Sequence, residues 1–154
     1  NVSVIWRNRS VIAYQYFKFL RKIMNTVFNV TPETKRSTII PIYNRNINAL
    51  KGIIKIAKKD NTKVLIYIAP IYQSNIPYKV DDYSNFKSDI YKLSLIHKDI
   101  VYFKDLDSSI PNKMWGLKDS TTLSKNIEVD YMHFQSIAHN KLANILYGII
   151  REIN

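Results

Sequence analysis

Residues 63–70 read Lys-Val-Leu-Ile-Tyr-Ile-Ala-Pro, a short and nearly continuous apolar run rich in β-branched side chains. A run of this length without polar alternation is typical of a strand that is buried on both faces of a parallel sheet. Residues 60–62, Asp-Asn-Thr, provide a turn before it, and Pro70 ends it. Ile100-Val101-Tyr102-Phe103 is a second run of the same kind. The chain therefore contains two predicted buried strands.

Helical periodicity surrounds these strands. Residues 44–59, 82–98 and 135–154 each repeat apolar side chains at helical spacing, with polar side chains between them. Alternation of buried strands with amphipathic helices predicts an α/β fold with a parallel sheet covered by helices. Two strands are too few to form such a sheet alone. We therefore expect residues 1–154 to be the C-terminal part of a larger fold, or to borrow strands from a partner.

The N-terminal region has a different character, although no boundary in it is sharp enough to divide the chain. Residues 11–28 predict a helix with Ser10 as its N-cap. Apolar residues cover much of its circumference, so it either packs on two sides or exposes an aromatic face. We interpret residues 1–42 as this helix plus a connection, and residues 43–154 as the α/β part.

Composition narrows the function classes. The 154 residues include 46% hydrophobic side chains, which indicates a globular chain, and no cysteine, which excludes disulfides and thiolate chemistry. The net charge of +11 favours an anionic partner. Its lysines are scattered singly, however, and no nucleic-acid-binding signature accompanies them, so we predict no nucleic-acid function.

Asp130 and His133 are the candidate catalytic residues. Residues 112–129 read as a long polar loop, and the pair is expected where this loop enters the final helix. A histidine there can act as a general base that an aspartate orients. The simpler interpretation is that Asp130 caps the helix and His133 is a polar residue of its first turn.

A metal site built from Asp130 and His133 with Glu128 or His139 is disfavoured, because histidines six residues apart do not share a helical face. No cofactor is predicted.

Candidate substrate-binding residues are Tyr72, Gln73 and Trp115. The first two follow the C-terminal end of the first strand, where ligands bind in open α/β sheets. Trp115 lies in the long polar loop that leads toward Asp130.

Asp130-Tyr131-Met132-His133-Phe134 and the helix behind it resemble the last block of the SGNH (GDSL-type) hydrolases. In that superfamily an Asp-x-x-His before the final helix supplies two members of a Ser-His-Asp triad. The resemblance implies a flavodoxin-like three-layer α/β/α fold with a parallel sheet. Residues 64–70 are similar to its penultimate core strand, and residues 100–103 to its last.

Residues 76–78 and Trp115-Gly116 look like the membrane-associated, DltD-like branch of the superfamily. That branch implies a serine esterase or acyltransferase acting on acetyl or D-alanyl esters of cell-envelope polymers. It also implies a membrane-bound O-acyltransferase as partner, and an extracytoplasmic or periplasmic location with a membrane anchor outside this chain.

The Gly-Asp-Ser block that carries the nucleophile does not occur here, nor does a Gly-x-Ser-x-Gly elbow. Ser108, Ser109 and Ser120 more simply serve loops or caps. We expect the nucleophile on a segment preceding Asn1 and the isolated chain to be nearly inert. The alternative is a non-catalytic docking module, in which positive charge meets an anionic envelope polymer while Tyr14, Tyr16, Phe17 and Phe19 meet a membrane-bound acyltransferase.

Overall fold

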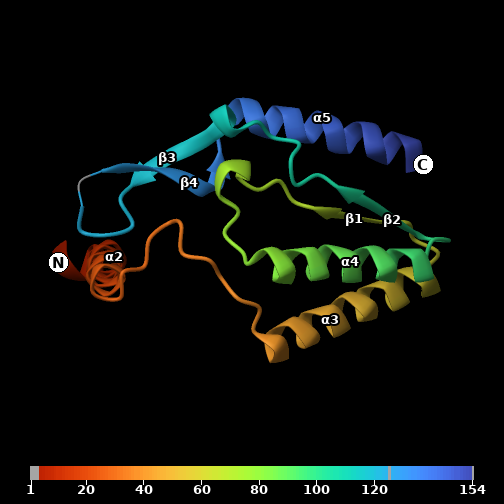
Figure 1. The fold of residues 1–154 in the computed structure, drawn as a ribbon, viewed down its shortest axis with the longest axis horizontal. Coiled ribbons are helices and arrows are strands. Elements are labelled where there is room, and N and C mark those ends of the chain that lie inside the picture. Colours follow the sequence, from red (N-terminus) through yellow and green to blue (C-terminus); the bar gives the residue numbers. More distant parts are fainter. Residues whose placement is uncertain (1–3, 125, 154) are drawn as a thin grey trace. The chain divides into compact units, whose positions relative to one another are not determined.

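The computed structural model describes residues 4–124 and 126–153 (Figure 1). The helices and strands follow one another in this order: α1 (Val4–Arg7), α2 (Arg9–Val27), α3 (Ile40–Lys59), β1 (Val64–Ile68), α4 (Val80–Ile96), β2 (Val101–Asp105), β3 (Trp115–Asp119), β4 (Ile127–Phe134) and α5 (Ser136–Ile153). Short 3₁₀ turns, η1 (Gln73–Asn75) and η2 (Asn112–Met114), lie in the connections. The chain is a mixed α/β protein, as its sequence predicts.

The chain forms two compact units. One consists of Asn1–Thr34 with Leu117–Asp130, and the other of Lys35–Gly116 with Tyr131–Asn154. The first unit contains α2 and the outer half of the β3–β4 pair. The second contains α3, α4, α5 and the β1–β2 pair, and it carries the larger core.

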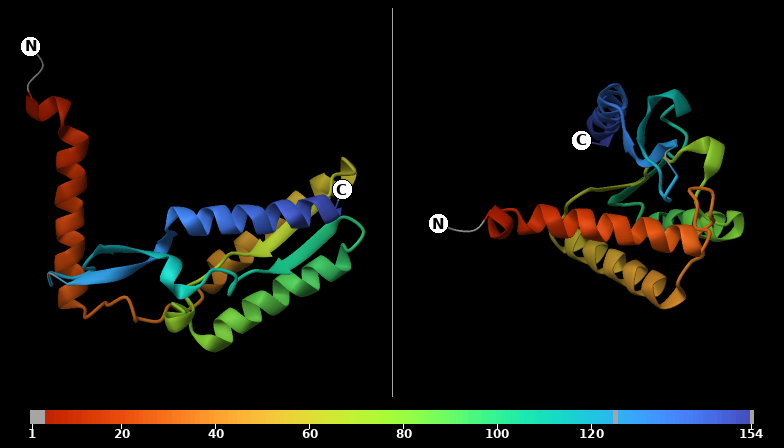
Figure 2. Two further views of the ribbon diagram at one scale, coloured as in Figure 1. Left: turned by 90° about the horizontal axis from the view of Figure 1, so that it is seen from above. Right: turned by 90° about the vertical axis from the view of Figure 1, so that its left-hand side faces the viewer.

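The second unit is built on the two predicted strands. β1 and β2 pair in parallel, with Val64 opposite Val101 and Ile68 opposite Asp105. The connection between them contains α4, which is the crossover that a parallel pair requires. α3 and α4 lie on one side of the pair and α5 on the other (Figures 1 and 2). Helices therefore cover both sides of the parallel pair.

The core of this unit lies between α3, α4 and the strands. It consists of Ile54, Ala57, Leu93, Ile100 and Val101, with Leu50, Val64 and Ile66 packed against it. Ile54 is only 1% exposed, and its helix places Ala57 one turn further along the same face. The residues of α3 that contribute to the core therefore recur at the helical spacing that the sequence predicts.

Helix boundaries differ from the predicted ones by a few residues. α3 begins at Ile40 because Pro41 fits the first turn of a helix, where the missing backbone N–H costs nothing. α2 begins at Arg9, so its N-cap is Asn8 and the predicted cap Ser10 lies inside the helix. α2 has no buried residue, which matches the expectation of an exposed aromatic face.

The predicted long loop over residues 112–129 is wrong. That segment contains η2, the whole of β3 and the start of β4, and β3 pairs with β4 in a two-stranded sheet. The connection between them, residues 120–126, is much shorter than a parallel crossover, so the pair is a hairpin. Ile127-Glu128-Val129-Asp130 alternates apolar and polar side chains, which is the period of a strand with two different faces.

The tip of this hairpin is held by a half-buried carboxylate. Glu128 accepts hydrogen bonds from the hydroxyls of Ser120 (2.9 Å) and Thr121 (2.6 Å) and from the backbone N–H of Thr121 (2.9 Å). Burial alone would raise the pKa of Glu128, but these hydrogen bonds outweigh it and hold the pKa below its ordinary value. Ser120, one of the serines considered as a nucleophile, thus anchors the turn.

Candidate active site

The carboxyl ends of β1 and β2 lie side by side, because the two strands are parallel and in register up to Ile68 and Asp105. In open α/β sheets ligands bind beyond these ends. The loop after β1 and the loop after β2 are joined by main-chain hydrogen bonds, from Leu106 N–H to the Ile68 carbonyl (3.2 Å) and from Ile71 N–H to the Asp107 carbonyl (2.9 Å). The edge is therefore one continuous surface of the second unit.

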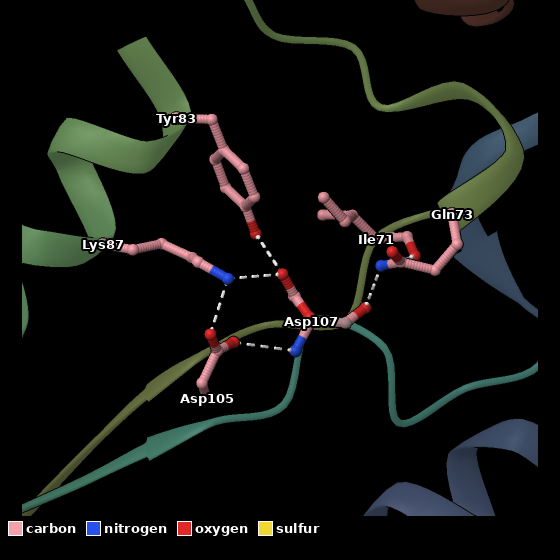
Figure 3. A network of polar contacts seen from close by, with 6 residues as sticks. All are labelled: Ile71, Gln73, Tyr83, Lys87, Asp105 and Asp107. Carbon is pink, nitrogen blue, oxygen red and sulfur yellow. Dashed lines mark hydrogen bonds and ion pairs between the residues drawn. The ribbon is translucent and has the colours of Figure 1, made fainter. Parts of the chain in front are cut away.

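A network of charged side chains secures this edge (Figure 3). Lys87, on α4, places Nζ 2.6 Å from a carboxylate oxygen of Asp105 and 2.8 Å from one of Asp107. The Tyr83 hydroxyl donates to the same Asp107 oxygen at 3.3 Å. Hydrogen bonds to Asp105 and Asp107 raise the pKa of Lys87 above its ordinary value, although burial opposes them. Lys87 thus bridges two neighbouring carboxylates and offsets half of their charge.

This network was not predicted from the sequence. Asp105 ends β2, Asp107 follows it, and Lys87 comes from the preceding helix, so only the packing of α4 on the strand brings them together. No group of three or more potential metal-ligating side chains occurs within residues 4–124 and 126–153. We interpret the network as a clamp that fixes the two loops, because both carboxylates are occupied by the lysine.

Gln73 joins the same two loops. Its side-chain amide donates to the carbonyls of Ile71 (3.2 Å) and Asp107 (2.7 Å), and its backbone N–H donates to Asn112 Oδ1 (3.1 Å). Asn112 in turn donates to the Ser74 hydroxyl. Both amide hydrogens of Gln73, a predicted substrate-binding residue, are used inside the protein, and they hold η1 in place.

Tyr72 and Trp115, the other two predicted binding residues, lie against each other. Their ring centroids are 5.9 Å apart in an edge-to-face arrangement. Tyr72 also packs edge-on against Tyr131 at 5.2 Å, and Trp115 packs against Phe134 at 4.6 Å. We call these four residues the aromatic cluster. It joins the loop after β1 to the strand that carries His133.

Trp115 is the buried member of the aromatic cluster, at 4% exposed. Its indole Nε1 has no hydrogen-bond partner in the described part of the chain. A buried donor of this kind costs about 1–3 kcal/mol when it is left unsatisfied, so the ring is retained here at an energetic cost. Tyr131 and Phe134 were not identified from the sequence, although as aromatic residues flanking Met132-His133 they were visible in it.

Asp130 and His133 lie inside β4, not at the start of the final helix. The expected local geometry of the pair is therefore wrong, and the interpretation of Asp130 as a helix cap is wrong with it. In a regular strand, residues three apart project to opposite faces and residues two apart to the same face. This alternation places Tyr131, rather than Asp130, on the strand face of His133. His133 is exposed and Asp130 is half-buried.

No protein-family model, no curated protein and no solved structure matches this chain.

Proposed function

We propose that the second unit is the C-terminal part of a flavodoxin-like, SGNH-type α/β fold, and that further parallel strands complete its sheet. The parallel β1–β2 pair, its α4 crossover and helices on both sides support this proposal. A hollow of about 260 Å³ beside β1, lined mainly by apolar and aromatic residues of β1, α3 and α4 together with Asn46, supports it too. Parallel sheets are normally larger than two strands and covered on both faces.

For this fold we propose an ester hydrolase or acyltransferase activity in which His133 is the general base. The observation that carries the proposal is the contact between Tyr72 and Tyr131. Through this contact the loop at the carboxyl end of β1, where ligands of such sheets bind, lies against the face of β4 that carries both Tyr131 and His133. The Asp130-x-x-His133 resemblance supplies the reaction class.

The proposed reaction has two steps. A serine supplied by a segment outside residues 1–154 attacks the ester carbonyl while His133 accepts its proton. The tetrahedral intermediate collapses, the C–O bond to the alcohol breaks, and the alcohol leaves with that proton. Water or an acceptor hydroxyl then attacks the acyl-serine, again losing its proton to His133, which returns it to the serine. The resemblance assigns to Asp130 the stabilisation of the imidazolium, although the alternation of β4 turns the two side chains to opposite faces.

The proposed substrate is an acetyl or D-alanyl ester of a cell-envelope polymer, with Tyr72 and Trp115 lining its site. The proposed partner is a membrane-bound O-acyltransferase, and the proposed location is extracytoplasmic, with an anchor outside residues 1–154. These follow from the resemblance to the DltD-like branch.

The test is hydrolysis of p-nitrophenyl acetate by residues 1–154 alone and by the protein extended with its preceding segment. We expect turnover only from the extended protein and a loss of roughly 10³-fold or more in His133→Ala. His97→Ala is the matched control, because His97 caps α4 before the amino end of β2, at the opposite edge of the pair. Equal activity of His133→Ala and His97→Ala would refute the proposal.

Asp130→Asn tests the second member of the pair separately, because the strand alternation of β4 favours Tyr131 as the neighbour of His133. A loss close to that of His133→Ala would show that the two residues act as a unit. A loss below about tenfold would show that His133 works without Asp130.

The second candidate is the non-catalytic docking module, which the net charge of +11 favours. It predicts that His133→Ala leaves binding of an anionic polymer and biological function intact. The two candidates therefore give opposite results with one variant.

A further inference from the structure

α2 is an amphipathic helix whose polar side, rather than its apolar side, packs against the hairpin of the first unit. On a helical projection most of its exposed apolar residues fall on one half of the circumference, which we call the apolar arc: Ile12, Tyr16, Phe17, Phe19, Met24 and Val27. Val11, also exposed, lies on the opposite half. The opposite half, the polar arc, carries Tyr14, Lys18, Arg21, Lys22, Asn25 and Thr26. A surface helix of a globular protein normally turns its apolar side toward the protein.

In the first unit the polar arc makes the hydrogen bonds to the hairpin. Lys18 forms an ion pair with Asp119 at 3.1 Å. The Asn25 amide donates to the Thr121 carbonyl at 3.0 Å, and the Thr26 hydroxyl accepts from the Leu123 backbone N–H at 3.1 Å. These contacts set the rotation of α2 on the hairpin.

The apolar arc is left open as a consequence. Its six residues are between 50% and 69% exposed, from Ile12 to Val27. Leu20 and Ile23, within the same arc, are half-buried. Exposed apolar surface of this extent on a helix marks an interaction site. Helix propensity alone does not explain it, because such a helix gains most of its stability from burying one face.

The charge of the segment identifies the partner. Residues 4–32 contain five basic side chains, Arg7, Arg9, Lys18, Arg21 and Lys22, and no acidic one. Trp6 is 61% exposed, and the Arg9 guanidinium lies 4.5 Å from the centre of its ring. Basic and aromatic side chains along an apolar helix face are the composition of helices that lie in a membrane interface.

Docking in the membrane interface differs from spanning the bilayer. No helix within the described residues is long and apolar enough to span a bilayer. α2 has 19 residues, but Lys18, Arg21 and Lys22 lie in its second half.

We propose that α2 docks, by its apolar arc, in the interface of an anionic lipid bilayer. The apolar arc enters the headgroup and acyl boundary, while Arg9 beside Trp6 and Arg21 on the border of the polar arc, both exposed, meet lipid phosphates. The polar arc remains on the hairpin, so docking requires no change within the first unit. This membrane contact is independent of the proposed catalytic activity.

The test is co-sedimentation of the full chain with vesicles of phosphatidylcholine containing about one third phosphatidylglycerol, compared with phosphatidylcholine alone. We expect binding to the anionic vesicles and a blue shift of Trp6 fluorescence on binding. Arg9→Gln combined with Arg21→Gln should weaken binding to anionic vesicles about thirtyfold, because each basic residue contributes about 1 kcal/mol, or about fivefold, near such a surface.

A matched pair of tyrosines isolates the apolar arc. Tyr16 and Tyr14 lie two positions apart on α2 and are 58% and 62% exposed, but Tyr14 is on the polar arc. Glutamine keeps the helix propensity high in both variants. Tyr16→Gln should lower binding by about fivefold and Tyr16→Gln with Phe19→Gln by at least about tenfold, whereas Tyr14→Gln should change it less than about twofold.

Three results would overturn the proposal. The first is no binding to anionic vesicles. The second is equal weakening by Tyr16→Gln and Tyr14→Gln, which would mean that charge alone attracts the chain, as for an anionic polymer. The third is a dimer in solution that only Tyr16→Gln dissociates, because the apolar arc would then be covered by a second copy.

Discussion

Replacing Lys87 by methionine tests whether the network of Figure 3 holds the carboxyl edge together. The variant keeps the length of the side chain and removes two ion pairs of 2.6 and 2.8 Å. The side chain of Lys87 is 29% exposed, and those of Asp105 and Asp107 are 37% and 16% exposed. The site thus lies between a surface pair, worth about 0–1 kcal/mol, and a buried one, whose disruption costs about 3–5 kcal/mol.

We therefore expect Lys87→Met to lower the free energy of unfolding by about 2–3 kcal/mol at neutral pH, because it also leaves two carboxylates facing each other. Urea denaturation measures this as a fall of about 1 M or more in the midpoint at an unchanged slope. The pKa of Lys87 is raised in the folded state, so its contribution is complete below the ordinary value of 10.5 and is lost only as the pH rises through the raised value.

Adding Asp107→Asn to Lys87→Met is the control. It removes the repulsion between the carboxylates, so the double variant should be more stable than Lys87→Met alone, with a coupling of about 1 kcal/mol or more. A loss below about 0.5 kcal/mol in Lys87→Met, or strict additivity of the two changes, would refute the role of the network as a clamp.

Further predictions concern the core, the hairpin tip and the loop after β1. Ile54→Ala should cost about 2–5 kcal/mol in thermal or urea unfolding, because the side chain is 1% exposed, and Ile53→Ala on the exposed side of α3 should cost under about 0.5 kcal/mol. Glu128→Gln should increase amide hydrogen exchange at Thr121; because the folded pKa of Glu128 is lowered, wild-type protection should be present above the ordinary glutamate pKa and fade as the pH falls through the lowered value. Gln73→Ala removes two hydrogen bonds and should destabilise by about 1–3 kcal/mol while leaving helix content unchanged in circular dichroism; no loss of stability would mean that the loops are held without it.

The fold of the second unit was predictable from sequence because each of its helices and strands shows a single, consistent pattern of apolar residues. Residues 63–70 and 100–103 are continuous apolar runs, and Ile54 and Ala57 recur at helical spacing on α3. The two short runs are assigned to strands by their length, their β-branched side chains and the turn residues beside them, because periodicity alone does not separate such a run from a buried helix. The structure placed β1, β2, α3, α4 and α5 within a few residues of the predicted ranges.

The hairpin was missed because its signal is short and mixed. Leu117 and Ile127 are more than two-thirds exposed, so the strands are not apolar runs, and the Ser- and Thr-rich connection over residues 120–126 dominates the composition. The alternation of apolar and polar residues in Ile127-Glu128-Val129-Asp130 nonetheless indicates a strand.

The candidate site was predictable only in part. Tyr72 and Gln73 were expected near the carboxyl edge from their place after β1, a rule of fold geometry, and their role in substrate binding stays a prediction. The Lys87 network could not be predicted, because its members come from α4 and from the end of β2. No pattern in the sequence shows which face of a helix packs against a given strand.

The most direct test of the proposed active site is labelling of the extended protein with a fluorophosphonate, which reacts with a serine that a neighbouring base has activated, followed by mass spectrometry of the peptides. We expect one labelled serine, outside residues 1–154, with a labelling rate that falls roughly 10³-fold or more in His133→Ala and is unchanged in His97→Ala. Labelling of Ser108, Ser109 or Ser120, or labelling that His133→Ala leaves untouched, would contradict it.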